Sequence, residues 1–212
     1  MHKKFFRDTI SGMTHLVAAI IAIVGTVFLV ITSNGSVAEI VSKLIFGLSM
    51  VLLFAASATY HLVRAPEKLI NTLKKVDHSM IYVLIAGTYT PVVSICFTGV
   101  LQLGYMVGIW GLALLGIIFK VFYAGRFRKV STILYIIIGW SIIFAVVPLY
   151  QVVGVGGIIL LLTGGALYSV GAIFYMLKKP NFSKNFGFHE LFHVLIILAA
   201  GALYALVLVY VN

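Results

Sequence analysis

The sequence contains few charged residues. Asp, Glu, Lys and Arg together make up 9% of its 212 residues, whereas a soluble domain usually contains about 25%. So few charges cannot cover the surface of a soluble protein of this length. Acidic residues are especially scarce, since 5 stand against 15 Lys and Arg residues, which gives a net charge of +10. Cysteine is nearly absent, and the single Cys96 cannot form a disulfide within the chain, so no oxidising compartment is indicated.

Apolar residues make up 62% of the chain, and the mean hydropathy is +1.16. They fall in blocks of roughly twenty residues, enough for a helix to cross a hydrocarbon core of about 30 Å. We therefore predict an all-α integral membrane protein, a bundle of seven transmembrane helices that forms one domain over residues 1–212. The predicted spans are residues 13–32, 40–63, 78–98, 101–119, 131–149, 154–177 and 189–211.

The basic residues lie in short groups between the apolar blocks, which excludes nucleic acid as a partner and leaves membrane lipid as the expected one. All of them except Lys43 fall in the N-terminal segment or in the loops after the second, fourth and sixth predicted spans. Because Lys and Arg concentrate on the cytoplasmic side of membrane proteins, we expect the N-terminus inside and the C-terminus outside. The expected location is the cell (plasma) membrane, crossed several times.

Titratable residues inside or at the end of a membrane helix are costly, and here they share one level of the bundle. At the predicted outer ends only Glu39 and Lys43 occur. A polar site is therefore predicted near the inner membrane surface, although His15 and His78 could also be simple polar tips among the lipid headgroups. The residues at the predicted cytoplasmic ends are His15, His61, Asp77, His78, His189, Glu190 and His193.

His189 and His193 are four residues apart, so they lie on one face of a helix and can share a metal ion. Their segment has the H-E-x-x-H pattern, which supplies two zinc ligands and a general base in soluble metalloproteases. Because the pattern begins a membrane helix here, a protease is a weak interpretation, and Glu190 is interpreted as a solvent-facing residue of the first helical turn. His61 adds a third nitrogen, and three protein ligands with an open fourth position are typical of catalytic zinc sites.

Asp77 and Ser57 are the candidate catalytic residues of this site. Asp77 could hold a water molecule or accept its proton, because bound zinc lowers the pKa of water to about 7. It could equally cap the third helix by accepting hydrogen bonds from free backbone N–H groups. Ser57 lies four residues before His61, which places its hydroxyl one helical turn deeper in the membrane.

Three motifs, in this order, resemble the signature motifs of the progestin and adipoQ receptor (PAQR) family, and within it the bacterial branch called hemolysin III. They are Ser57-Ala-Thr-Tyr-His61, Asp77-His78 and His189-Glu-Leu-Phe-His193. The resemblance covers nearly the whole chain. It implies a zinc ion bound by His61, His189 and His193, with Asp77 at the water on the ion and Ser57 nearby. It also implies a relation to membrane hydrolases proposed to cleave lipid amides, and to membrane-lipid homeostasis.

Four classes of function follow from these observations. The first is a zinc-dependent hydrolase acting on an amide or ester of a membrane lipid, or a protein that otherwise serves lipid homeostasis. The second is a membrane-lytic, pore-forming hemolysin, which is disfavoured because most of the chain should stay in its own membrane. The third is electron transfer through a haem, against which the lack of histidines at the outer side argues. The fourth is a receptor-like protein whose zinc only clamps helices together.

Overall fold

The computed structural model describes residues 6–33, 36–123, 127–183 and 186–211. Within these ranges the regular structure is helical and contains no strand. The basic residues Lys3, Lys4, Arg126 and Lys184, which contribute to the predicted orientation, lie outside the described residues. The elements are α1 (Thr9–Ile31), α2 (Val37–Leu62), α3 (Glu67–Cys96), α4 (Gly99–Tyr123), α5 (Arg128–Trp140), the short 3-10 helix η1 (Ser141–Ala145), α6 (Val146–Leu177) and α7 (Phe188–Tyr210).

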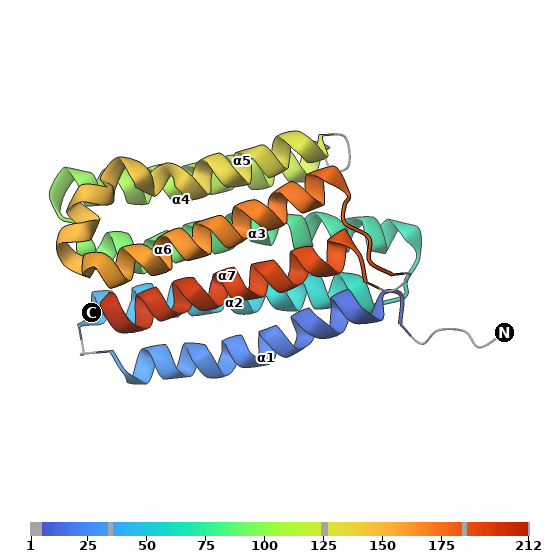
Figure 1. Ribbon diagram of the computed structural model, residues 1–212, viewed down its shortest axis with the longest axis horizontal. Helices are drawn as coiled ribbons and strands as arrows, with labels where there is room; N and C mark the ends of the chain where they lie inside the picture. The colour runs from blue at the N-terminus through green and yellow to red at the C-terminus, as the bar shows by residue number, and fades with distance from the viewer. Residues whose placement is uncertain (1–5, 34–35, 124–126, 184–185, 212) are drawn as a thin grey trace.

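In the described part of the chain, six helical stretches are long and apolar enough to cross a membrane. The fifth is a single stretch of 49 residues, Lys129–Leu177, which contains both the fifth and the sixth predicted spans. Its backbone breaks at Gly154, whose φ of 61° and ψ of −168° are not helical. Figure 1 shows the chain running along α5, reversing direction and returning along α6. The all-helical membrane fold is confirmed, whereas the number of seven spans and the orientation stay predictions.

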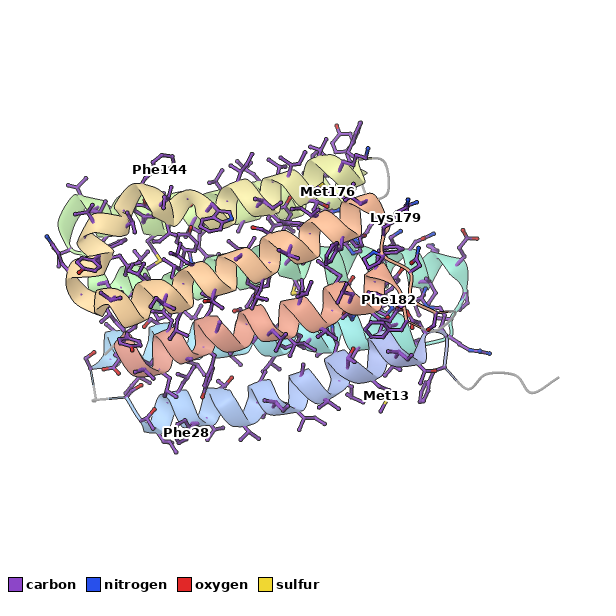
Figure 2. The ribbon with its side chains drawn as sticks, in the orientation of Figure 1. Met13, Phe28, Phe144, Met176, Lys179 and Phe182 are labelled. Carbon is purple, nitrogen blue, oxygen red and sulfur yellow. The ribbon has the colours of Figure 1, made fainter. Side chains whose placement is uncertain are left out.

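The outside of the bundle is apolar, as expected of a surface that faces lipid. On α1, Ile21 and Val24 leave 64% and 65% of their surface exposed, and Leu115 on α4 leaves 63%. Figure 2 shows Phe28 and Phe144 projecting outward from the bundle. Soluble monomers rarely expose continuous apolar surface of this extent. The chain is therefore a multi-pass integral membrane protein.

Helix α3 begins at Glu67, well before the predicted start of the third span at residue 78. Its first turns are polar but rich in Lys and Leu, which favour helix, and Pro66 precedes them with a φ of −54° that suits a helix start. Hydropathy marks only the apolar part of this helix, which is why the predicted span begins at residue 78. As a result Asp77 lies in the interior of α3, and the interpretation of Asp77 as an N-terminal cap is wrong.

The packing of the helices gathers the polar helix ends at one end of the bundle. Helix α2 packs against α1 and α3, and α7 packs against α6 and α1. The approach of α1 to α2 is so close that a Cβ atom on Gly47 would overlap Thr26. In Figure 1 the starts of α1, α3 and α7 and the end of α2 lie together, opposite the end of α7. Side chains at these four helix ends can therefore meet.

The opposite end of α2 carries a buried ion pair. Lys43 Nζ and Glu39 Oε1 are 2.7 Å apart, one helical turn from each other, and the two residues are 0% and 4% exposed. An isolated charge at this depth would be costly, and the carboxylate offsets the charge of the ammonium. Glu39 and Lys43, the titratable residues at the predicted outer ends, thus form an ion pair with each other, at the end of α2 opposite to His61.

Candidate metal centre

Three histidines from two helices converge into one group. His61 lies in the last turn of α2, and His189 and His193 lie in the first turns of α7. One ring nitrogen of each lies within 4.8 Å of the others, and the Nε2 atoms of His61 and His189 are 3.2 Å apart. Two nitrogens bound tetrahedrally to one zinc ion at about 2.05 Å would be about 3.3 Å apart. The group therefore has the donor atoms and the dimensions to hold such an ion.

Two further residues, which the sequence analysis missed, contact these histidines. Asp8, just before α1, places Oδ2 at 3.0 Å from His61 Nδ1, and the Ser11 carbonyl oxygen is 3.2 Å from His193 Nδ1. Burial by itself raises the pKa of the Asp8 carboxyl, but hydrogen bonds with His61 and Ser11, together with the electrostatic effect of His61 and His189, outweigh burial and lower the pKa to about 2. Asp8 is therefore a carboxylate at neutral pH.

His15 lies beside the group without belonging to it. Its ring stacks on His193 at a centroid distance of 3.8 Å and meets the edge of Phe54 at 5.2 Å. The residue is 3% exposed, so it is not a polar tip among headgroups. Neither of its ring nitrogens has a hydrogen-bond partner among the described residues. His15 thus offers hydrogen-bonding atoms at the wall of the cavity described below.

Asp77 faces the histidine group from α3. Its carboxylate lies 2.9 Å from His78 Nδ1, and the other nitrogen of His78 lies 3.3 Å from the Tyr175 hydroxyl. His78 is therefore held inside the protein rather than among headgroups. The Ser57 hydroxyl is close to the same carboxylate, and Asp77 is near enough to His61 to interact with it electrostatically. The structure thus brings both candidate catalytic residues to the side of the metal group.

A cavity of about 150 Å³ connects these residues with the interior of the bundle. Its polar end includes Ser57, Asp77, His189 and His193. The rest of its wall is mostly apolar and comes chiefly from α3, α5, α6 and α7, as far as Leu206. A cavity with apolar walls and a few converging polar groups suits a ligand that has an apolar chain next to a polar group.

The comparisons with known proteins agree with this picture. A family model described as haemolysin-III related matches residues 3–204. The chain belongs to this family. Hemolysin-3 of Bacillus cereus is 41% identical over 213 residues, covering 98% of this chain and 94% of the relative. The Hemolysin-3 homolog of Bacillus subtilis (strain 168) is 42% identical over 202 residues, covering 94% and 92%.

A more distant relative is the human monocyte to macrophage differentiation factor, which is 26% identical over 195 residues, 90% of this chain and 79% of that protein. The resemblance to hemolysin III is thereby confirmed. The matched range of this haemolysin-III related chain contains every residue of the centre, from Asp8 to His193. The names of the relatives state no cofactor, so the metal has to be inferred from the donor atoms.

Glu190, the acidic residue of the H-E-x-x-H pattern, has a structural role in this haemolysin-III related chain. Its Oε2 accepts a hydrogen bond from the Gly187 N–H at 2.7 Å, and its Oε1 accepts one from Ser11 Oγ at 3.1 Å. The first contact is the glutamate half of a capping box at the start of α7, since Gly187 has no side chain to supply the other half, and the second ties α7 to α1. The interpretation of Glu190 as a solvent-facing residue is wrong, and both of its oxygens are used in packing rather than turned to a substrate.

Proposed function

We propose that the chain crosses the membrane seven times, with its N-terminus in the cytoplasm and its C-terminus outside. The backbone break at Gly154 supports this number, because it divides the 49-residue stretch into two parts that run in opposite directions in Figure 1. The distribution of basic residues supports the orientation, since only Lys43 lies at the other end. The histidine group is then near the inner leaflet.

We propose further that His61, His189 and His193 bind zinc and that the protein hydrolyses an amide or ester of a membrane lipid. One observation carries the proposal. The proposed ligands His189 and His193 line the polar end of one mostly apolar cavity, together with the carboxylate of Asp77 and the hydroxyl of Ser57. Three neutral imidazoles with room for a further ligand are the donor set of catalytic zinc sites. The apolar part of the cavity would hold a lipid chain and keep water away from it.

Zinc, when bound, supplies a Lewis acid that lowers the pKa of water and polarises a carbonyl. The side chains of this protein supply the remaining chemistry. Asp77 takes the proton of the water that attacks the lipid carbonyl, and Ser57 donates a hydrogen bond to the oxygen on which negative charge develops. The proton on Asp77 then passes to the departing amine or alkoxide. The products are a fatty acid and an amine or an alcohol.

The proposal is tested on the full chain purified in detergent. We expect about one zinc ion per chain, as three converging ligands bind one ion. The preparation should release fatty acid from N-acyl or ester lipids, lose this activity with a chelator and regain it with added zinc. Full activity after complete removal of the metal would refute the hydrolase. If removal lowered the melting temperature and no lipid were cleaved with zinc present, the zinc would be a helix clamp.

The same preparation can distinguish a lytic function from lipid hydrolysis. The name Hemolysin-3 belongs to the Bacillus cereus relative and would correspond to membrane damage. Liposomes that contain the purified protein and an entrapped dye should stay sealed if the chain is a hydrolase of single lipids. Dye release without lipid cleavage would favour the pore-forming alternative instead.

Filling the cavity should block the reaction without affecting the metal. Ala172 on α6 is buried and lines the cavity, so we expect Ala172→Leu to reduce lipid turnover by at least about tenfold, by excluding part of the lipid chain. Zinc content should not change. Ala166→Leu, on the exposed side of the same helix, is the matched control and should retain the wild-type rate. Equal rates in both variants would show that the cavity does not hold the substrate.

A further inference from the structure

The stretch of chain that begins α1 lies against the metal group. The Asp8 N–H donates to the His61 carbonyl oxygen at 3.0 Å, and Asp8 Oδ2 lies 3.0 Å from the Nδ1 atom of the same residue. Ser11, which is completely buried, meets His193 Nδ1 with its carbonyl oxygen at 3.2 Å. Two of the three candidate ligands, on different helices, thus have partners from one short segment.

This segment is fastened on both sides of the contact. The Arg7 guanidinium donates to the Tyr60 carbonyl oxygen and lies 4.2 Å above the centroid of the Tyr60 ring. In return, Arg64 donates to the carbonyl oxygen of Phe6 at 3.1 Å. The residues before Asp8 are therefore attached to the end of α2 and to the loop after it. After Asp8, Ser11 Oγ donates to Glu190 Oε1 on α7 at 3.1 Å, so the carboxylate is held in place from both sides.

The two contacts decide which ring nitrogen can bind a metal. A carbonyl oxygen only accepts hydrogen bonds, so His193 must carry its proton on Nδ1. An ionised carboxylate also only accepts, which places the proton of neutral His61 on Nδ1 as well. In both rings Nε2 then keeps its lone pair, and Nε2 of His61 is the atom that lies 3.2 Å from His189 Nε2. The contacts leave the basic nitrogen free to bind an ion.

We infer that Asp8 and the Ser11 carbonyl are positioning residues of the metal centre. They fix the ring orientation of His61 and His193 and determine which ring nitrogen carries the proton. The segment that contains Asp8 and Ser11 is therefore part of the metal centre. This inference rests on the proposed function, because it concerns the same site. Partners of this kind raise the basicity of a histidine ligand, and their loss weakens metal binding about 10- to 100-fold.

The test measures zinc affinity by competition with a chelator, on full-length protein in detergent. Asp8→Ala should bind zinc about 10- to 100-fold more weakly than the wild type. Asp8→Asn, whose amide oxygen can still accept from His61, should lose less. Thr9→Ala is the matched control, because Thr9 is an exposed residue next to Asp8 in the same segment and contacts none of the three histidines. It should bind zinc as the wild type does.

The visible spectrum of the Co²⁺-loaded protein gives a second readout, since it reports the geometry around the ion. We expect Asp8→Ala to change this spectrum and Thr9→Ala to leave it unchanged. Wild-type affinity and spectrum in Asp8→Ala would overturn the inference while leaving the zinc site intact. Equal loss in Asp8→Ala and Thr9→Ala would also overturn it, because general loosening of the start of α1 would then be the cause. A wild type that binds no zinc would overturn the inference and the proposed function together.

Discussion

Replacing His193 by alanine is expected to reduce zinc affinity by more than about 100-fold, beyond the loss typical of a residue that only supports a ligand. His193 is 2% exposed and belongs to the group of three ring nitrogens within 4.8 Å. Without it two imidazoles remain, which is fewer than the three protein ligands of catalytic zinc sites. The measurement is zinc content after dialysis, followed by affinity from chelator competition, and lipid turnover should be lost in parallel.

A loss of zinc has to be separated from a loss of folding. His193 also stacks on His15, so the alanine variant loses packing as well as a ligand. His193→Gln keeps more of the side-chain volume, and its melting temperature should match that of the metal-free wild type. His78→Ala is the control for histidine replacement at the same level of the bundle, because His78 is not in the three-histidine group. Wild-type zinc affinity in His193→Gln would refute the proposed ligand set.

The sequence predicts the histidine group because helix geometry and membrane topology, both of which can be read from short segments of sequence, determine where the three histidines lie. Apolar blocks mark the helices, and the spacing of four residues puts His189 and His193 on one face. The distribution of basic residues then assigns His61 to the same level, although it is 128 residues away from His189. These steps need only helix geometry and membrane thickness, so the convergence of the three rings could be predicted without coordinates.

The residues that surround the ligands could not be predicted in this way. Asp8 lies outside the first apolar block, where a charged residue needs no special explanation, and its partner His61 is 53 residues away. Ser11 contributes a backbone carbonyl, which leaves no mark in the identity of the residue. The prediction of a solvent-facing Glu190 rests on the usual exposure of a first-turn carboxylate, whereas here the side chain is half-buried and accepts a hydrogen bond from Ser11 of α1. Each of these contacts depends on how α1 docks, which hydropathy does not report.

The length of α3 is a further feature that hydropathy does not predict. Hydropathy finds the part of a helix that lies in the hydrocarbon region, but a helix can extend beyond it on residues with good helix propensity. The early start of α3 at Glu67 removes Asp77 from a helix terminus. Of the two roles that the sequence left open for Asp77, this excludes the cap and leaves the role in the site.

Replacing Asp77 by asparagine is accordingly expected to lower lipid turnover by about 10²- to 10⁴-fold, the range for loss of a general acid–base group. Asparagine has nearly the same size and can still contact His78, but it cannot take a proton from the attacking water. Asp77 is not in the three-histidine group, so zinc content should stay at the wild-type level. The rate of fatty-acid release at saturating lipid, measured beside zinc content, checks both expectations.

The control for this experiment lies on the same helix. Glu67 is an exposed carboxylate at the start of α3, and Glu67→Gln makes the same chemical change away from the cavity. It should leave turnover unchanged. If Asp77→Asn kept the wild-type rate with zinc bound, the proton would have to go to another group, and His15, which lines the cavity and has no hydrogen-bond partner among the described residues, would be the next to test. If both zinc and turnover were lost, Asp77 would support the metal centre rather than act as its base.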